Sequence, residues 1–109
     1  MSDHERRKYV RLHVPLEVRW QSASGGYTAR VGDIGVGGCY VDSIAHVLVG
    51  EHVSLEVQLP TGGWLALGGE VVNHQPDAGF GVRFTDLTEA SQETLARLVD
   101  SAGEGRPGS

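Results

Sequence analysis

The segment Leu12–Trp20, with the sequence LHVPLEVRW, alternates apolar and polar positions along its whole length. Its apolar members stand two residues apart: Leu12, Val14, Leu16, Val18 and Trp20. A period of two is typical of a β-strand that buries one face and exposes the other. Pro15 lacks a backbone N–H, so we expect this strand to begin at a sheet edge or at a bulge. The segment therefore predicts a β protein.

The same pattern returns in five further segments, which we predict to be strands. In chain order they are 27–33, 39–43, 53–59, 64–74 and 80–84. Turn-forming residues separate several of them, at 22–26, 60–63 and 76–79. The fifth strand should be kinked where Gly68 and Gly69 interrupt it, whereas the apolar connection 44–50 indicates no particular form. Six short strands at close spacing favour a small antiparallel barrel, because closure removes exposed strand edges.

The C-terminal part of the chain changes period. Its apolar residues recur at three- and four-residue steps, which is typical of an amphipathic helix: Leu87, Ala90, Leu95, Leu98 and Val99. Thr88 is the expected N-cap, Glu89 lies in the first turn, and the helix should end near Gly103. The predicted fold is therefore dominated by β-structure, a six-stranded antiparallel β-barrel with one C-terminal α-helix. We expect this domain to span 6–101, between flexible tails at 1–5 and 102–109.

Length and composition limit the class of protein. The 109 residues suffice for one domain, and 16 glycines without a collagen-like period indicate many tight turns. The single cysteine excludes an internal disulfide, and the five histidines show no short metal-binding spacing. The carboxylates are not recognisably paired for acid–base catalysis, so we expect neither a metal site nor an enzyme. With no signal peptide and no apolar run near the roughly 18 residues of a membrane span, we expect a cytoplasmic protein that does not insert into a membrane.

A few single residues have predicted places in the barrel. Cys39 follows the glycine turn with no evident base nearby, so we expect it to be a small core residue. Trp20 and Trp64 are predicted to pack in the barrel, and either could lie near a ligand. His13 and His52 occupy strand positions that should face solvent.

Charge is distributed unevenly along the chain. Residues 1–11 carry four basic and two acidic side chains, whereas the remainder carries five basic and twelve acidic ones, for a net charge of -5. Proteins that coat nucleic acid are usually basic overall. A single cationic segment on an acidic body fits one small anionic ligand better than a long polyanion.

Two short segments carry the candidate binding residues: RRKYVR at 6–11 and DIGVGG at 33–38. An arginine presents a planar fork of N–H donors that matches phosphate oxygens and the O6/N7 edge of guanine. Arg7 and Arg11 stand where the tail meets the first strand, although such arginines can also be mere solvated charge. Asp33 could accept hydrogen bonds from guanine N1–H and N2–H, or could form an Asx-type turn. The glycines could bring backbone N–H groups close to a phosphate, or could only permit positive φ.

The order of these segments resembles the PilZ domain family. Arg7-x-x-x-Arg11 precedes the first predicted strand, and Asp33-x-Gly35-x-x-Gly38 lies between the second and the third. This order is similar to the family signature, RxxxR followed by [D/N]xSxxG. The segment GFGVRFTD, just before the helix, also resembles the closing strand of the family. The resemblance covers roughly Arg6 to Asp100.

The resemblance implies a six-stranded barrel with a helix at one end, and binding of the bacterial second messenger cyclic di-GMP. By position, Arg7 and Arg11 would bind phosphate and the Hoogsteen edge of guanine. Asp33 would accept from the guanine donors, and Gly38 would fix the turn. Arg6 matches a position where arginines of the family often stack on a second ligand molecule, so one or two molecules per domain are expected.

Gly35 departs from the family signature, because it occupies the serine position. A hydroxyl that would meet the ligand is therefore missing. One net hydrogen bond is worth ~0.5–1.5 kcal/mol, which corresponds to up to about tenfold in affinity. We expect weaker binding of cyclic di-GMP, but not its loss.

The expected function is that of a bacterial cyclic di-GMP receptor acting in motility or biofilm regulation. Its Arg-rich N-terminal arm would order over the ligand, and a downstream protein partner would read the changed surface. One alternative is a degenerate PilZ domain that no longer binds the nucleotide and serves as a protein–protein interaction module. A more distant alternative is a small nucleic-acid-binding barrel, which the acidic body and the lack of an aromatic platform disfavour.

Overall fold

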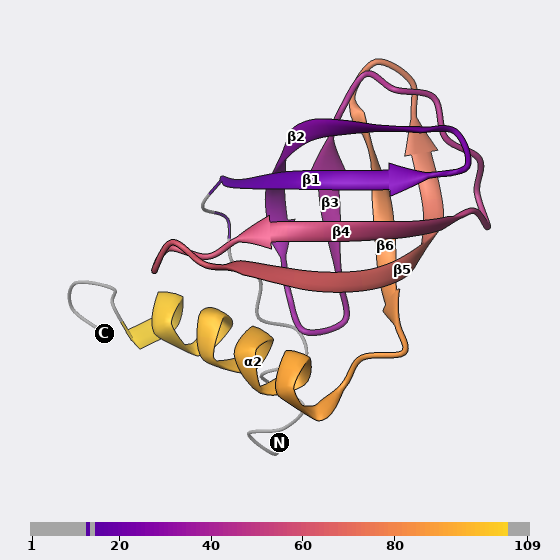
Figure 1. Ribbon diagram of the computed structural model, residues 1–109. Helices are drawn as coiled ribbons and strands as arrows, with labels where there is room; N and C mark the ends of the chain where they lie inside the picture. The colour runs from indigo at the N-terminus through magenta and orange to yellow at the C-terminus, as the bar shows by residue number, and fades with distance from the viewer. Residues whose placement is uncertain (1–12, 14, 105–109) are drawn as a thin grey trace, which may run out of the picture.

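The computed structural model describes residue 13 and residues 15–104. Its elements are β1 (Leu16–Ser22), β2 (Gly25–Ile34), β3 (Gly38–Asp42), β4 (His52–Gln58), β5 (Trp64–Gln75), β6 (Gly79–Thr85) and α2 (Glu89–Glu104). The strands close into a barrel in the order β1-β2-β3-β6-β5-β4, and every neighbouring pair is antiparallel. Helix α2 lies across one end of this barrel (Figure 1). The predicted six-stranded antiparallel barrel with one C-terminal helix is therefore confirmed.

The start of the first strand requires a correction. β1 begins at Leu16, immediately after Pro15, and not at Leu12 as predicted. His13 is exposed and belongs to no strand. Proline cannot donate to a strand ladder, so pairing with β2 starts only beyond Pro15. The following turn is also tighter than predicted, because β1 extends to Ser22 and only residues 23–24 separate it from β2.

The core follows from the alternation in the strands. In β1 and β4 every second side chain is buried, and the two strands pair Val18 with Val57 and Trp20 with Leu55. Apolar side chains from all six strands and from α2 meet in one cluster inside the barrel. Burial of apolar surface stabilises a fold by about 25 cal/mol per Å², so this shared interior is the main stabilising element.

Strand β5 connects the two halves of the barrel. Its first half pairs with β4 and its second half with β6, and both pairings overlap around Gly69. A Cβ atom on Gly69 would lie 2.6 Å from the carbonyl oxygen of Arg83, so the close approach of β6 requires glycine there. The register of β5 against β6 shifts between Val71 and Asn73. This irregularity lies beyond Gly68 and Gly69, where the kink was predicted.

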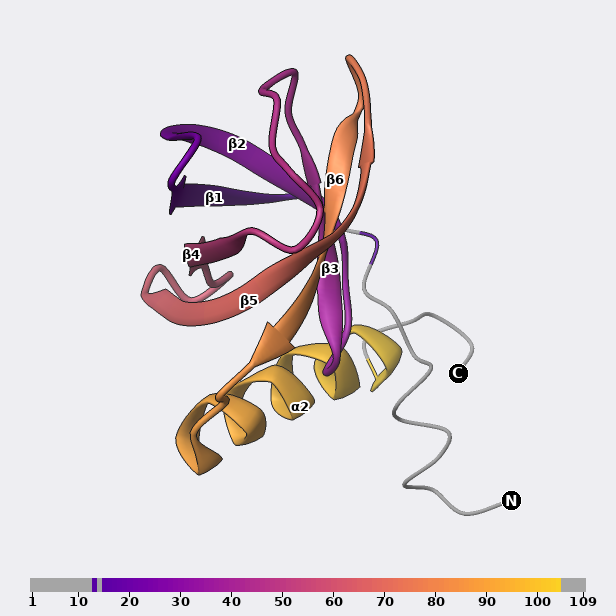
Figure 2. The same ribbon diagram turned by 90° about the vertical axis from the view of Figure 1, so that its right-hand side faces the viewer.

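Helix α2 covers the barrel end opposite the β1–β2 hairpin, as Figure 2 shows from the side. Thr88 caps the helix, since the Ser91 N–H donates to Thr88 Oγ1 at 3.0 Å. Three residues form its buried face: Leu95, Leu98 and Val99. Ala90, which was predicted on that face, is exposed. The helix includes 102–104, part of the predicted flexible tail, and the rest of that tail lies outside the described residues, as does the predicted tail at the N-terminus.

The loop at 43–51 is fastened to the β1–β2 hairpin by Glu51. Glu51 Oε1 accepts from the Leu48 N–H at 2.9 Å and from the Ser24 hydroxyl at 2.7 Å, and Oε2 accepts from the Ser24 N–H at 3.0 Å. Hydrogen bonds from Ser22, then Leu48 and Ser24, lower the pKa of Glu51 from 4.5 to about 2. The ionised carboxylate thus holds two loops of the same barrel end together.

Glu51→Gln should lower the free energy of unfolding at neutral pH. A depressed carboxyl pKa stabilises the fold fully above the unfolded value of 4.5, and this contribution is lost as pH falls through the folded value of about 2. The difference between wild type and variant should therefore narrow between these two pH values. Urea unfolding followed by tryptophan fluorescence at several pH values would measure it. Glu93→Gln, on the exposed face of α2, is the control, and a difference independent of pH would contradict the assignment.

Candidate ligand-binding surface

Three of the predicted binding residues come together at the turn between β2 and β3. Asp33 is the second-last residue of β2, Gly35 begins the turn, and Gly38 begins β3. Asp33 is half-buried, and the turn lies at the barrel end that α2 covers (Figure 1). The other three predicted residues lie outside the described part of the chain: Arg6, Arg7 and Arg11. Their placement beside this turn stays a prediction.

Backbone hydrogen bonds build the turn. The Gly35 N–H donates to the Gly38 carbonyl at 2.9 Å, and the Phe84 N–H of β6 donates to the Gly37 carbonyl at 2.9 Å. None of these glycines has positive φ, so the turn does not use their left-handed freedom. Gly38 is required for close approach instead, because a Cβ atom there would collide with the Val82 carbonyl oxygen. A Cβ atom on Gly37 would meet nothing within 4 Å.

The turn opens onto a groove of about 400 Å³ on the outer face of β3, β6 and β5. Its lining includes Asp33, Tyr40, Val72, Asn73, Gly81 and Arg83. Glycines also line it, and a strand without side chains at such positions exposes its backbone to a ligand. The groove therefore combines one carboxylate, one guanidinium and an accessible backbone.

Tyr40 and Asn73 are held in place against β6. The Tyr40 hydroxyl donates to Gln75 Oε1 at 2.6 Å, and the tyrosine ring lies beside Gly79, where a Cβ atom would be 2.7 Å from Cε2 of the ring. The Gly81 N–H donates to Asn73 Oδ1 at 3.2 Å. These bonds fix an aromatic ring and an amide at the groove.

Side chains of both positive and negative charge line the groove. The Arg83 guanidinium pairs with Glu70 at 2.7 Å, and its side chain is 60% exposed. A guanidinium carries five N–H donors, so one carboxylate contact leaves further donors for an anion. The half-buried Asp33 carboxylate lines the same groove. Val72, 44% exposed at the register shift of β5, adds apolar surface.

Sequence reasoning missed four groove residues: Tyr40, Val72, Asn73 and Arg83. For Tyr40 and Arg83 a signal was available, because each alternates with buried neighbours on β3 and β6 and must therefore face outward. For Val72 and Asn73 no such signal exists, because the register shift displaces them from the simple alternation.

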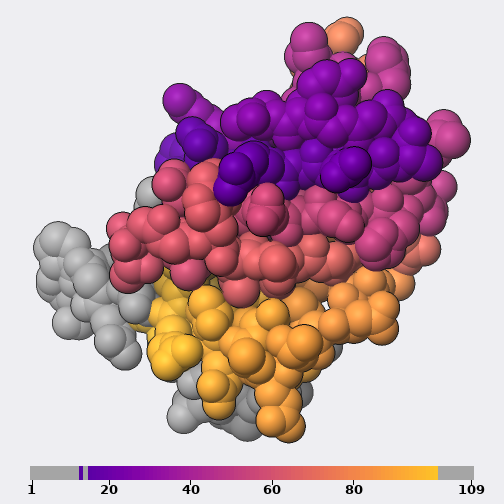
Figure 3. Space-filling model, viewed as in Figure 1, coloured from indigo at the N-terminus to yellow at the C-terminus, as the bar shows by residue number. Residues whose placement is uncertain are grey.

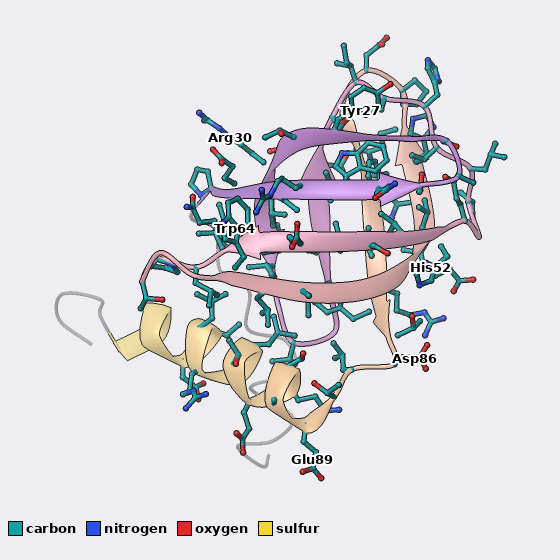
Figure 4. All side chains as sticks on the ribbon, in the orientation of Figure 1. Tyr27, Arg30, His52, Trp64, Asp86 and Glu89 are labelled. Atoms are coloured by element: carbon teal, nitrogen blue, oxygen red, sulfur yellow. The ribbon has the colours of Figure 1, made fainter. Side chains whose placement is uncertain are left out.

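Predictions for other residues have mixed outcomes. Trp20 is buried at 3% exposure and Cys39 is also in the core, as predicted. The packing prediction is wrong for Trp64, which lies on the outside of the barrel, with the Arg19 guanidinium carbon 3.8 Å from its ring centroid (Figure 4). His52 is exposed, as predicted. Within the described residues, no three His, Cys, Asp or Glu side chains gather as a metal site would require, and no helix there is long and apolar enough to cross a bilayer.

A family model described as "PilZ domain" matches residues 5–101 of the chain. No curated protein matches the sequence.

Solved structures share the fold at low sequence identity. The PilZ domain of CeSA from a cellulose-synthesizing bacterium is 21% identical, with a TM-score of 0.66 over 85% of this chain and 97% of that chain. The Bacillus subtilis inhibitor of motility (MotI/DgrA) is 20% identical, with a TM-score of 0.71 over 93% and 53%. YcgR from Escherichia coli, in complex with c-di-GMP, is 19% identical, with a TM-score of 0.75 over 91% and 46%. The chain thus spans about half the length of the latter two proteins.

Gly38→Ala should destabilise the barrel, whereas Gly37→Ala should not. The added methyl group at Gly38 meets the Val82 carbonyl oxygen, and the same group at Gly37 meets open space. Overpacking of this kind costs about 1–3 kcal/mol. The free energy of unfolding in urea would measure the difference, and equal stability of the two variants would show that β3 and β6 can separate at this turn.

Proposed function

Because the chain belongs to the PilZ domain family, a family of non-catalytic cyclic di-GMP receptors, we propose that it binds cyclic di-GMP and signals through a protein partner. The observation that carries the proposal is the position of Asp33 and Gly38. Both stand at the family's motif positions, and both line the groove on the outer face of the barrel.

The register of the first hairpin supports a role for the N-terminal arginines. Leu16 pairs with Val31, two residues before Asp33, so the chain enters β1 beside the end of β2 that carries the turn. Arg11 precedes Leu16 by five residues, and five extended residues span up to ~17 Å. Arg7 stands one further step of four residues away. This part of the chain is long enough to reach the groove.

Cyclic di-GMP offers two phosphates and two guanines, and the proposed roles divide between them. Arg7 and Arg11 bind phosphate and the Hoogsteen edge of guanine, because their N–H forks match both. Asp33 accepts from guanine N1–H and N2–H. Gly38 keeps the turn close to β6, so that the groove stays open beside it. Arg6 stacks on a second molecule, which gives one or two ligands per domain.

The described residues of the groove add to this set. Tyr40 and Val72 provide apolar surface against which a base can lie. Arg83 provides a further cation, restrained by its contact with Glu70. We propose that the ligand draws the Arg-rich arm onto this groove and that a protein partner reads the new surface.

One observation favours a second candidate function. Gly35 is buried and stands where the family signature has serine, so the hydroxyl expected at the ligand is missing. A domain that no longer binds the nucleotide would act as a protein–protein interaction module of the same fold. The two experiments below separate these functions.

Wild-type protein should bind cyclic di-GMP saturably in calorimetric titrations at physiological salt. The Arg7→Ala, Arg11→Ala double variant should lose this binding, because each arginine provides charge-assisted hydrogen bonds that no other residue replaces. Arg97→Ala, an exposed arginine of α2, is the matched control and should bind like wild type. The molar ratio at saturation would show whether one or two cyclic di-GMP molecules bind per domain. No heat with wild type at high ligand concentration, together with unshifted amide resonances, would favour the interaction module.

Gly35→Ser should bind cyclic di-GMP more tightly than wild type. The restored hydroxyl adds one hydrogen bond of ~0.5–1.5 kcal/mol, or up to about tenfold in Kd. Gly37→Ser is the control, because serine fits there but stands two residues from the signature position. An affinity of Gly35→Ser equal to that of the wild type would show that the hydroxyl does not reach the ligand.

A further inference from the structure

The most exposed apolar side chains gather at one end of the barrel. Six large hydrophobic residues of the described chain are at least 36% exposed, and four of them exceed half. These four form what we call the loop-end surface: Tyr27 (58%), Val49 (65%), Leu48 (72%) and Ile44 (78%). The β1–β2 hairpin, the loop 43–51 and the β5–β6 turn meet at this end, opposite α2 (Figure 1).

The loop-end surface borders a hollow of about 610 Å³, larger than the groove beside Asp33. Tyr27 and Ile44 both line it, together with Ala45 and His46. Figure 3 shows residues of the loop projecting beyond the β1–β2 hairpin at this end. Exposed apolar side chains beside a hollow offer a place where the side chains of a partner can insert as anchors.

The loop holds these side chains outward in a fixed conformation. Val47, between the exposed residues, is 5% exposed and packs into the core. The Gly50 N–H donates to the Val71 carbonyl at 2.7 Å, and the Val71 N–H donates to the Glu51 carbonyl at 2.9 Å. The Glu51 carboxylate ties Leu48 to the hairpin, as described above. Preorganised surface loses little conformational entropy when a partner binds.

Charge at this end is negative. The three segments that form it contain neither lysine nor arginine: 22–27, 42–52 and 74–79. They carry three carboxylates: Asp42, Glu51 and Asp77. Arg30 of β2 stands opposite Asp42 and balances part of this charge. The end therefore combines apolar surface with an excess of acid.

We propose that the loop-end surface docks a basic amphipathic protein segment. Its apolar residues would cover Ile44, Leu48 and Val49, and its lysines or arginines would face Asp42 and Asp77. A second copy of this chain would bring like carboxylates together, and an anionic bilayer would meet the same repulsion. A basic segment satisfies both the apolar and the acidic features. The docking does not depend on the nucleotide, because the surface lies at the other end of the barrel from Asp33.

Selection from a random-peptide display library on the immobilised full-length protein tests this proposal. Enriched peptides should combine large apolar residues with lysine or arginine. Synthetic copies should bind the Ile44→Ser, Leu48→Ser double variant at least about tenfold more weakly, since central apolar anchors dominate such interfaces. The Asp42→Asn, Asp77→Asn variant should bind the same peptides several-fold more weakly than wild type at low salt, and this difference should be smaller at high salt. Asparagine tolerates the positive φ of 63° at Asp77.

Matched controls show whether a loss of peptide binding is specific to the loop-end surface. Trp64→Ser removes an exposed aromatic residue from another face and should leave peptide binding unchanged. The Ile44→Ser, Leu48→Ser variant should unfold at the wild-type temperature, because both side chains are exposed. It should also titrate with cyclic di-GMP like wild type, so a failed docking surface is distinguishable from a failed nucleotide site.

Four results would overturn the proposal. Enrichment of acidic peptides, or of no peptides, would contradict the charge and apolar arguments. Equal binding to the Ile44→Ser, Leu48→Ser variant would place the contact elsewhere. Concentration-dependent dimerisation that this variant abolishes would assign the surface to a second copy. Binding of phosphatidylglycerol vesicles that it abolishes would assign the surface to a membrane.

Discussion

The structure depends on how closely β6 is approached by its two neighbours, β3 and β5. At three positions a Cβ atom would meet a carbonyl oxygen of an adjacent strand: Gly38, Gly69 and Gly79. Closing only six strands into a barrel forces strong twist and curvature, and glycine is the residue that lets the backbones pass so near. Because these glycines carry no side chains, the outer face of β6 is unobstructed, and Tyr40 and Asn73 can lie against it. One constraint thus serves both the closure of the barrel and the shape of the groove.

Antiparallel order gives the two ends of the barrel different connections. The barrel end that α2 covers carries the short turn at 35–37, whose geometry is set by backbone hydrogen bonds to β3 and β6. The opposite end carries the longer loop at 43–51, whose conformation is fixed by hydrogen bonds to the Glu51 carboxylate. Strand β3 runs from one to the other within five residues, with Tyr40 on the groove and Asp42 on the hollow. The proposed nucleotide site and the proposed docking surface are therefore separate, but a single short strand contributes to both.

Most of the fold could be predicted from the sequence, because the barrel interior is apolar and most strands place apolar residues at alternating positions. The errors arise where another effect is stronger than alternation. Proline delays the start of β1 to Leu16, and a register shift turns Val72 outward. The error at Trp64 is of another kind: its apolar ring suggested packing, but Leu65 and Leu67 occupy the more buried positions of β5, and Trp64 lies outside against Arg19. For the site, the motif spacing led to Asp33 and Gly38. For Tyr40 and Arg83 the local alternation indicates only that they face outward, and the pairing of β3 with β6 brings them to one groove.

Closure through β1 and β4 has a consequence for how the chain folds. Val18 must find Val57, and Ser22 must find Val53, although two complete strands lie between them in the sequence. Such distant pairs form only after much chain entropy has been lost, and β topologies of this kind fold in milliseconds to seconds. During synthesis, the β1–β2 hairpin leaves the ribosome before β4 does, so one side of β1 stays unpaired and its apolar face uncovered for that interval. Misassembly with other nascent chains is most probable then, and it ends when β4 docks.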